Sequence, residues 1–132
     1  GIEPAPQGSK KHVGHGRMIE VSKRVKPWRK AVYLEALAQR APLIEGACDV
    51  AVVFRFRRPK AHLNKQGKLK PVAPKFVTVK RNDIDKLLRS TLDALTGSAI
   101  LDDSQVVTVA AEKRYCLEGE PTGAEIIIKS LE

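Results

Sequence analysis

The sequence has few cysteines and no long apolar run. Only two of its 132 residues are cysteines, Cys48 and Cys116, and neither belongs to a C-x-x-C pair. Each has apolar neighbours, so we expect two buried thiols in a reducing compartment, with no disulfide framework and no zinc site. No stretch approaches the roughly 18 apolar residues of a membrane span, and the first twenty residues are too polar for a signal peptide. We therefore expect a cytoplasmic protein.

Aromatic residues are also scarce, at 5% of the chain. This scarcity disfavours a surface that binds nucleic acid by base stacking. The length fits one domain, spanning residues 1–132, with a core large enough to need no cross-links. His12 and His15 stand in a polar, glycine-containing segment, and we interpret them as loop residues rather than metal ligands.

Acidic residues are absent from 55–81, and the charge is divided along the chain. Residues 1–82 hold 19 Lys+Arg and 5 Asp+Glu (19 − 5 = +14), whereas residues 83–132 hold 5 and 10 (5 − 10 = −5), which together give the net charge of +9. A basic portion beside an acidic cluster is typical of a polyanion binder with a metal site. A solvated basic face with no partner is the alternative.

The acid-free stretch contains three prolines and little periodicity, which predicts a loop over about 57–81. A loop this long in a compact domain is usually functional or disordered. Counted from Arg55, it carries ten basic residues: Arg55, Arg57, Arg58, Lys60, Lys65, Lys68, Lys70, Lys75, Lys80 and Arg81.

The remaining patterns predict a mixed α+β domain with about four or five strands in one sheet. Apolar spacing indicates a helix at about 26–40, with Pro27 in its first turn and Trp28 as a core anchor. A second helix is expected over 84–95, where Asp83 is placed as the N-cap and Gly97 as the terminator. Its apolar stripe is the clearest in the chain: Ile84, Leu87, Leu88, Thr91, Leu92 and Leu95. Strands are expected at about 17–21, 47–57, 106–114 and 124–129.

Five aspartates fall within 21 residues, at 83, 85, 93, 102 and 103. Magnesium prefers oxygen ligands, so three of them could form a metal site. The helix is roughly 18 Å long, and the eight residues from Leu95 to Asp103 reach about 26 Å when extended. Asp103 can therefore return to the end that carries Asp83 and Asp85.

Simpler readings remain open on spacing alone. Asp83 could serve only as an N-cap, and Asp102 and Asp103 could only form a turn. Asp93 is expected on the exposed side, either solvated or paired with Arg89. An EF-hand is excluded, because its sixth loop position requires glycine and here holds Leu88.

Two runs in this region resemble the RusA family of Holliday junction resolvases. Residues 83–96 read DIDKLLRSTLDALT and residues 101–107 read LDDSQVV, against the family pattern D-x-D-N, a helix ending in D-A-L, and then D-D-x-Q-V. The opening residues 4–9 also resemble the start of phage-borne members. The match is strong over 83–107 and loose elsewhere.

The resemblance implies a homodimeric, Mg²⁺-dependent crossover junction endodeoxyribonuclease of mixed α/β fold, in which Mn²⁺ can substitute for Mg²⁺. It assigns Asp83, Asp85 and Asp103 as metal ligands and Asp102 as a residue behind them or a weak ligand. The family often has asparagine where this chain has Lys86, and a catalytic lysine where it has Arg89. Arginine can hold a phosphate but cannot give up a proton. We therefore expect Arg89 to stabilise charge.

These assignments predict an enzyme that nicks the two-fold symmetric arms of a four-way DNA junction, with no small-molecule cofactor and no membrane association. Lys86 and the basic residues from Arg57 to Arg81 would contact the DNA backbone, which confers affinity without reading sequence. Three alternatives remain: a non-catalytic nucleic-acid-binding module, a relative that acts on other branched DNA, and a structural protein. Close carboxylates disfavour the first, because they repel phosphate unless a cation lies between them.

Overall fold

The computed structural model describes residues 11–13, 16–21, 28–79 and 83–132. Their strands form one five-stranded sheet with the order β1-β2-β5-β3-β4. The strands are β1 (Lys11–Val13), β2 (Gly16–Val21), β3 (Cys48–Phe56), β4 (Val106–Tyr115) and β5 (Gly123–Ser130). All neighbours are antiparallel except β3 and β4, which run parallel. Strand β4 is therefore an edge strand, reached through a long crossover connection.

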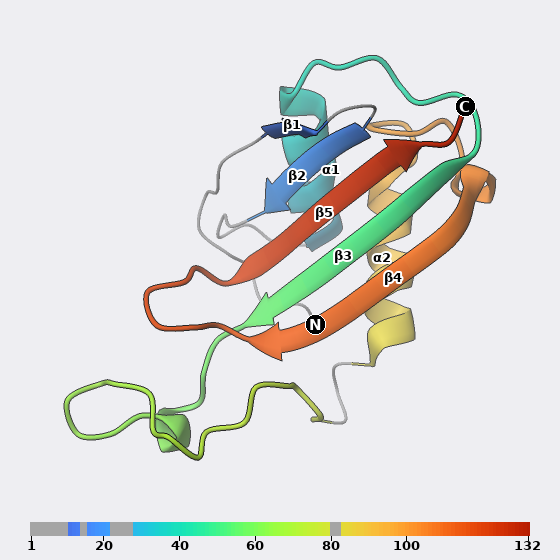
Figure 1. Cartoon of the computed structure of the whole chain (residues 1–132). Helices are drawn as coiled ribbons and strands as arrows, with labels where there is room; N and C mark the ends of the chain where they lie inside the picture. The colour runs from blue at the N-terminus through green and yellow to red at the C-terminus, as the bar shows by residue number, and fades with distance from the viewer. Residues whose placement is uncertain (1–10, 14–15, 22–27, 80–82) are drawn as a thin grey trace.

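Two α-helices, α1 (Trp28–Ala38) and α2 (Ile84–Leu95), lie together behind the sheet in Figure 1. Two single-turn 3₁₀ helices, η1 (Lys60–His62) and η2 (Asp103–Gln105), lie in the crossover between β3 and β4. The expected α+β class is confirmed. So are the helix at 84–95 and the four expected strands, each within a residue or two of its predicted ends. The short strand β1 was not predicted.

The core forms between the helices and one face of the sheet. Along β3, Val50, Val52 and Phe54 are fully or almost fully buried, and they lie opposite Ile128, Ile126 and Ala124 of β5. The alternating sequence pattern that predicted this strand therefore reflects side chains that point in turn to the two faces of the sheet. Both cysteines are buried and unbridged, as expected, and burial, followed by the charge of Asp49, raises the pKa of the Cys48 thiol.

Trp28 is the core anchor that the sequence predicted. Its side chain is 5% exposed, and its Nε1 donates a hydrogen bond of 3.3 Å to Thr91 Oγ1, which joins α1 to α2. The Thr91 hydroxyl itself donates to the Leu87 carbonyl at 2.8 Å. A hydroxyl in an apolar stripe is thus satisfied on both sides.

The apolar residues of α1 do not all lie on its buried face. Leu34 and Leu37 are each 44% exposed, whereas Glu35 is 3% exposed. The buried stripe follows the spacing i, i+3, i+4, i+7 and i+8, through Trp28, Ala31, Val32, Glu35 and Ala36. Because the fourth position of this stripe is the charged residue Glu35, apolar spacing alone does not reveal the buried face of the helix.

The N-terminal resemblance at 4–9 lies outside the described residues, as do His15 and Pro27. Within the described part of the chain, no helix is long and apolar enough to cross a membrane.

Candidate active site and basic loop

Asp83 and Asp85 lie at the N-terminal end of α2, where both side chains are exposed. Asp83 is the N-cap residue, but its carboxylate makes no capping hydrogen bond. Its closest described cation is Lys86, whose Nζ lies 3.6 Å from Asp83 Oδ2. The positive end of the helix dipole favours carboxylates at this position. This helix end therefore presents two accessible carboxylates that do not serve to cap it.

Asp103 lies at the other end of α2. It begins η2, which leads directly into the start of β4, and Val106 there pairs with Cys48 at the start of β3. The opposite end of β4, at Tyr115, bonds to the loop segment that leads toward Asp83. Figure 1 shows η2 and the first turn of α2 at opposite ends of the helix, which is roughly 18 Å long.

The expected return of Asp103 to Asp83 and Asp85 within one chain is therefore wrong. Among the described residues, no three histidine, cysteine or carboxylate side chains are grouped so that they could hold a metal ion. A single described chain supplies two of the three expected ligands at one point. Two carboxylates are compatible with Mg²⁺, but the three-aspartate set does not fit one subunit.

The segment after α2 does not extend back, because it is folded tightly against residues 44–46. Gly97 adopts a positive φ of 85°, which ends the helix at the predicted terminator,. The Ile44 N–H then donates to the Ala99 carbonyl at 2.9 Å. These contacts fix residues 96–100 beside the C-terminal end of α2, so the chain reverses only when β4 begins.

Gln105 fastens the turn that carries Asp103, a role that the sequence patterns did not predict. Its Oε1 accepts hydrogen bonds of 2.8 Å from the N–H groups of Leu101 and Asp102. Its Nε2 donates to the carbonyls of Ile44 at 2.7 Å and Gly46 at 2.9 Å. The available signal was the glutamine of the D-D-x-Q-V pattern, to which no role was assigned.

Asp102 has a structural role in the same turn. Its carboxylate accepts a hydrogen bond of 2.9 Å from the Ser104 N–H and forms a capping box with Gln105. The hydrogen bonds from Ser104 hold the pKa of Asp102 below its usual value. The turn alternative raised from the sequence thus accounts for Asp102 without a metal.

The remaining charged residues of α2 divide between packing and solvent. Asp93 pairs with Arg29 of α1, Nη2 to Oδ2 at 3.7 Å, so the expected intrahelical pairing with Arg89 is wrong. Arg89 is exposed one turn beyond Asp85, and residues at this spacing share a helix face. Its guanidinium can therefore reach a ligand held at the helix end.

The basic loop has defined anchors at both ends. Arg58 Nε donates to the Cys116 carbonyl at 2.9 Å, and its Nη1 donates to the Pro74 carbonyl. The Arg58 guanidinium also lies 5.2 Å from the centre of the Tyr115 ring, within cation–π range,. Arg58 therefore fastens the loop to β4. Its Nε and Nη1 are engaged within the protein, and a contact of Arg58 with DNA stays a prediction from the sequence.

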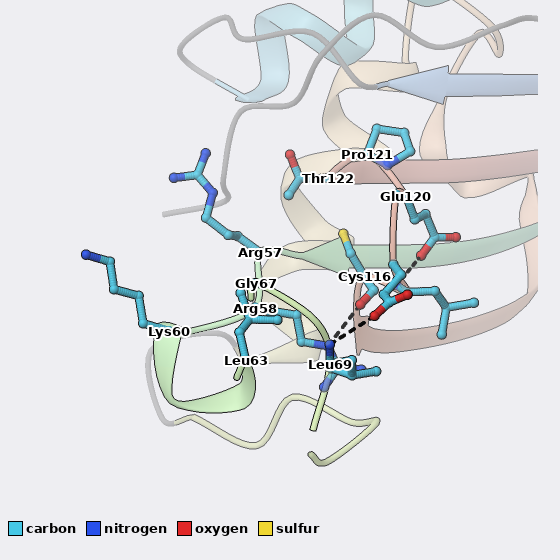
Figure 2. Close-up of a pocket in the computed structure, with 13 residues that line it drawn as sticks. Arg57, Arg58, Lys60, Leu63, Gly67, Leu69, Cys116, Glu120, Pro121 and Thr122 are labelled. Atoms are coloured by element: carbon cyan, nitrogen blue, oxygen red, sulfur yellow. Dashed lines mark hydrogen bonds between the residues drawn. The ribbon is translucent and has the colours of Figure 1, made fainter. Parts of the chain in front are cut away.

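The loop also packs over the connection between β4 and β5, around a cavity of about 540 Å³. The Leu69 N–H donates to Glu118 Oε1 at 3.0 Å across this contact. Figure 2 shows Arg57 and Lys60 at the rim with their side chains directed outward, away from Glu120. The interior of the loop is structural, whereas its rim carries outward cations.

Most other loop cations are exposed, namely Lys65, Lys68, Lys70 and Lys75. Arg55 differs, because it lies within β3, inside the predicted strand 47–57, and is only 6% exposed. Lys80 and Arg81 lie outside the described residues. In Figure 1 the loop occupies the same end of the molecule as the first turn of α2.

An ion pair stabilises the connection beneath the loop. Arg114 binds Glu120 through two hydrogen bonds, Nη1–Oε1 at 2.6 Å and Nη2–Oε2 at 2.8 Å. The Arg114 hydrogen bonds lower the pKa of Glu120 to about 2, and the same contact raises the pKa of Arg114. Glu120 also accepts from the Leu117 N–H at 3.0 Å, so the turn after β4 is held from both sides.

An α+β domain with accessible carboxylates at one helix end and a basic loop at the same end has the features of an enzyme that acts on a polyanion. The chain matches the family model for endodeoxyribonuclease RusA over residues 1–129. It therefore belongs to the RusA family, whose members are crossover junction endodeoxyribonucleases. No curated protein matched the chain.

Proposed function

We propose that this protein is a structure-selective endonuclease, a phage-type member of its family, that resolves Holliday junctions and related branched DNA by paired nicks in recombination and repair. The observation that carries the proposal is the pair of accessible carboxylates, Asp83 and Asp85, at the end of the molecule that also carries the basic loop. Family membership supplies the reaction class.

The proposed metal is Mg²⁺, with Mn²⁺ as a substitute, held by Asp83, Asp85 and Asp103. When bound, such an ion orients the phosphate and lowers the pKa of an attacking water. Asp83 and Asp85 would supply two carboxylate ligands at the N-terminus of α2, where the helix dipole offsets part of their mutual repulsion. Asp103 of the same subunit lies too far away to join them, so one subunit alone does not hold the complete set of ligands.

Arg89 has the place and charge to stabilise the phosphate during cleavage. It follows Asp85 by four residues, so both lie on the same side of α2. A guanidinium can form two parallel hydrogen bonds to phosphate oxygens, and in a site from which water is excluded this stabilises developing charge. Arginine side chains do not exchange protons as acids or bases in proteins, so we assign Arg89 charge stabilisation and no proton transfer.

The proposed DNA-binding surface consists of exposed cations along the basic loop and one at the helix end. Those described are Arg57, Lys60, Lys65, Lys68, Lys70, Lys75 and Lys86; Lys80 and Arg81 complete the set as predictions from sequence. Their contacts would be to phosphates, which position DNA and carry no sequence information. A homodimer would present two such surfaces to the symmetric arms of a junction.

The direct test is incubation of the protein with a labelled four-way junction and with a linear duplex of matching sequence, with and without Mg²⁺. We expect symmetric nicks in the junction alone and only with the metal. Asp85→Asn should abolish nicking and retain junction binding, while Asp93→Asn, on the same helix, should retain both. Tight binding without nicking by the unaltered protein would instead support the non-catalytic nucleic-acid-binding module. Nicking of other branched DNA alone would show that the four-way junction is not the substrate.

A further inference from the structure

Phe76, in the basic loop, is the most exposed of the six aromatic residues in the chain. It is 50% exposed, whereas Tyr33 is 38% exposed and the other four are at most 8% exposed. We propose that Phe76 stacks on a base at the branch point of the DNA substrate and thereby favours branched DNA over continuous duplex. This role rests on the proposed nuclease function and specifies how the protein recognises its substrate.

The backbone on both sides of Phe76 is fixed to β4. The Tyr115 N–H donates to the Lys75 carbonyl at 2.9 Å, and the Val77 N–H donates to the Lys113 carbonyl at 3.5 Å. Between these two hydrogen bonds, Phe76 forms an antiparallel bridge to β4. Single exposed apolar residues are common on protein surfaces, but this ring stands on a segment that the sheet holds in place.

The burial of Val77 sets the direction of the Phe76 side chain. Val77 is 1% exposed and belongs to the hydrophobic core. Successive side chains of an extended segment point to opposite sides, so the Phe76 ring is directed toward solvent. An aromatic side chain has only two side-chain torsions, so it loses little conformational freedom when it contacts a ligand. The ring is therefore presented in a position ready for stacking.

The surroundings of the ring are basic and suit a nucleotide. Lys75 Nζ lies 5.0 Å from the centre of the Phe76 ring, and Lys70 is exposed in the same segment. Residues 55–81 contain no acidic side chain. A base that stacks on Phe76 brings its phosphates close to these cations. An aromatic ring beside backbone-binding cations is the combination by which proteins bind unstacked nucleotides.

Phe76 also lies between the basic loop and the proposed cleavage site. Asp83 follows it by seven residues, whose backbone spans at most about 23 Å at ~3.3 Å per residue. Figure 1 shows the loop at the same end of the molecule as the first turn of α2. Successive nucleotides of one DNA strand are about 3.4 Å apart along the helix axis. A base on Phe76 therefore lies within about seven nucleotides of a phosphate held at Asp83 and Asp85.

A branch point offers a surface for stacking that a continuous duplex lacks. In a duplex, neighbouring base pairs cover both faces of each base, so a ring gains access only by unstacking them, at a cost in free energy. At a branch point the stacking is interrupted and base faces are available. Every base has a face that an aromatic ring can cover. Phe76 therefore selects branched structure without selecting sequence, and one ring suffices for one base face.

Binding measurements on the full chain test this role. Each variant is made in an Asp85→Asn background, in which DNA is bound in Mg²⁺ but not cut, and its affinity is measured for a four-way junction and for a linear duplex of matching sequence. Phe76→Ala should weaken junction binding by roughly 5- to 100-fold, the effect of losing one stacked base, and leave duplex binding unchanged. Phe76→Tyr keeps a ring and should retain the junction preference, whereas Phe76→Leu should lose it.

A fluorescent base reports stacking directly. A junction that carries 2-aminopurine beside the branch point should lose fluorescence when it binds the protein with Phe76 or Phe76→Tyr, and should lose less with Phe76→Leu. The matched control is Val72→Ala, which removes another exposed apolar side chain of the same loop, 88% exposed. This control should change neither the affinities nor the fluorescence.

The outcomes distinguish this role from the function on which it rests. Equal losses of junction and duplex affinity in Phe76→Ala, or an unchanged junction preference in Phe76→Leu, would overturn the stacking role alone. The comparison of Phe76→Tyr with Phe76→Leu gives the answer even if Phe76→Ala proves unstable in thermal unfolding. If the unaltered protein neither prefers nor nicks branched DNA in Mg²⁺, the proposed function fails and the stacking role fails with it.

Discussion

Arg58 donates a hydrogen bond from Nε to the Cys116 carbonyl at 2.9 Å, which ties the start of the basic loop to the end of β4. Arg58→Ala should lower the free energy of unfolding by roughly 1–3 kcal/mol, because the carbonyls of Cys116 and Pro74 lose a charged donor,. The nearby change Lys60→Ala, at an exposed side chain, should alter stability by less than about 0.5 kcal/mol while weakening DNA binding. Urea unfolding measures the free energy of unfolding, and junction titrations measure DNA binding. Equal stability losses in the two variants would contradict the structural role of Arg58.

The loop cations should set the salt dependence of DNA binding. Lys65→Ala combined with Lys68→Ala should reduce the slope of log affinity against log salt by about 0.9 for each phosphate that the variant no longer neutralises. The matched control is Lys30→Ala with Lys129→Ala, which removes two exposed lysines elsewhere. Fluorescence anisotropy between low and moderate salt gives the slopes. An unchanged slope in the loop variant would remove the loop from the DNA-binding surface.

Glu120 should contribute stability that depends on pH. Its folded pKa of about 2 lies below the ordinary value of 4.5, so its contribution is complete above about pH 4.5 and is lost as the pH falls toward 2. Glu120→Gln should lower the free energy of unfolding at pH 7 by about 1–2 kcal/mol, less than the full pKa shift implies, because solvent screens a partly exposed ion pair. The difference between wild type and variant should shrink below pH 4.5. The exposed Glu45→Gln serves as the control, and a difference that is constant with pH would refute this assignment.

Gln105 should position Asp103 through the turn that it fastens. Gln105→Ala removes four hydrogen bonds, so we expect a loss of about 1–3 kcal/mol in stability and weaker nicking with junction binding retained. Gln105→Glu can still accept from Leu101 and Asp102 but cannot donate to the two carbonyls, so it should not restore nicking. Thermal unfolding and single-turnover nicking test this, and full nicking by Gln105→Ala would exclude a positioning role.

Local patterns determined much of this protein from sequence alone. The stripe from Ile84 to Leu95 predicted α2 with its observed ends. The signals for both ends, a cap residue and a terminating glycine, are local in the sequence of an amphipathic helix. The alternation along β3 predicted its buried face for a similar reason. The D-x-D and D-D-x-Q-V patterns led to the family, which the family match bears out.

Tertiary structure decided what depends on contacts between distant residues. Chain length allowed Asp103 to reach Asp83, but the hydrogen bonds of Gln105 to residues 44–46 hold it at the far end of α2. The sequence patterns did not predict the burial of Glu35, the ion pair of Asp93 or the hydrogen bonds of Arg58, because each depends on residues from other elements. Sequence spacing bounds how far a segment can extend. The hydrogen-bond partners of the segment decide where it lies, and here they leave the three aspartates divided between the two ends of one helix.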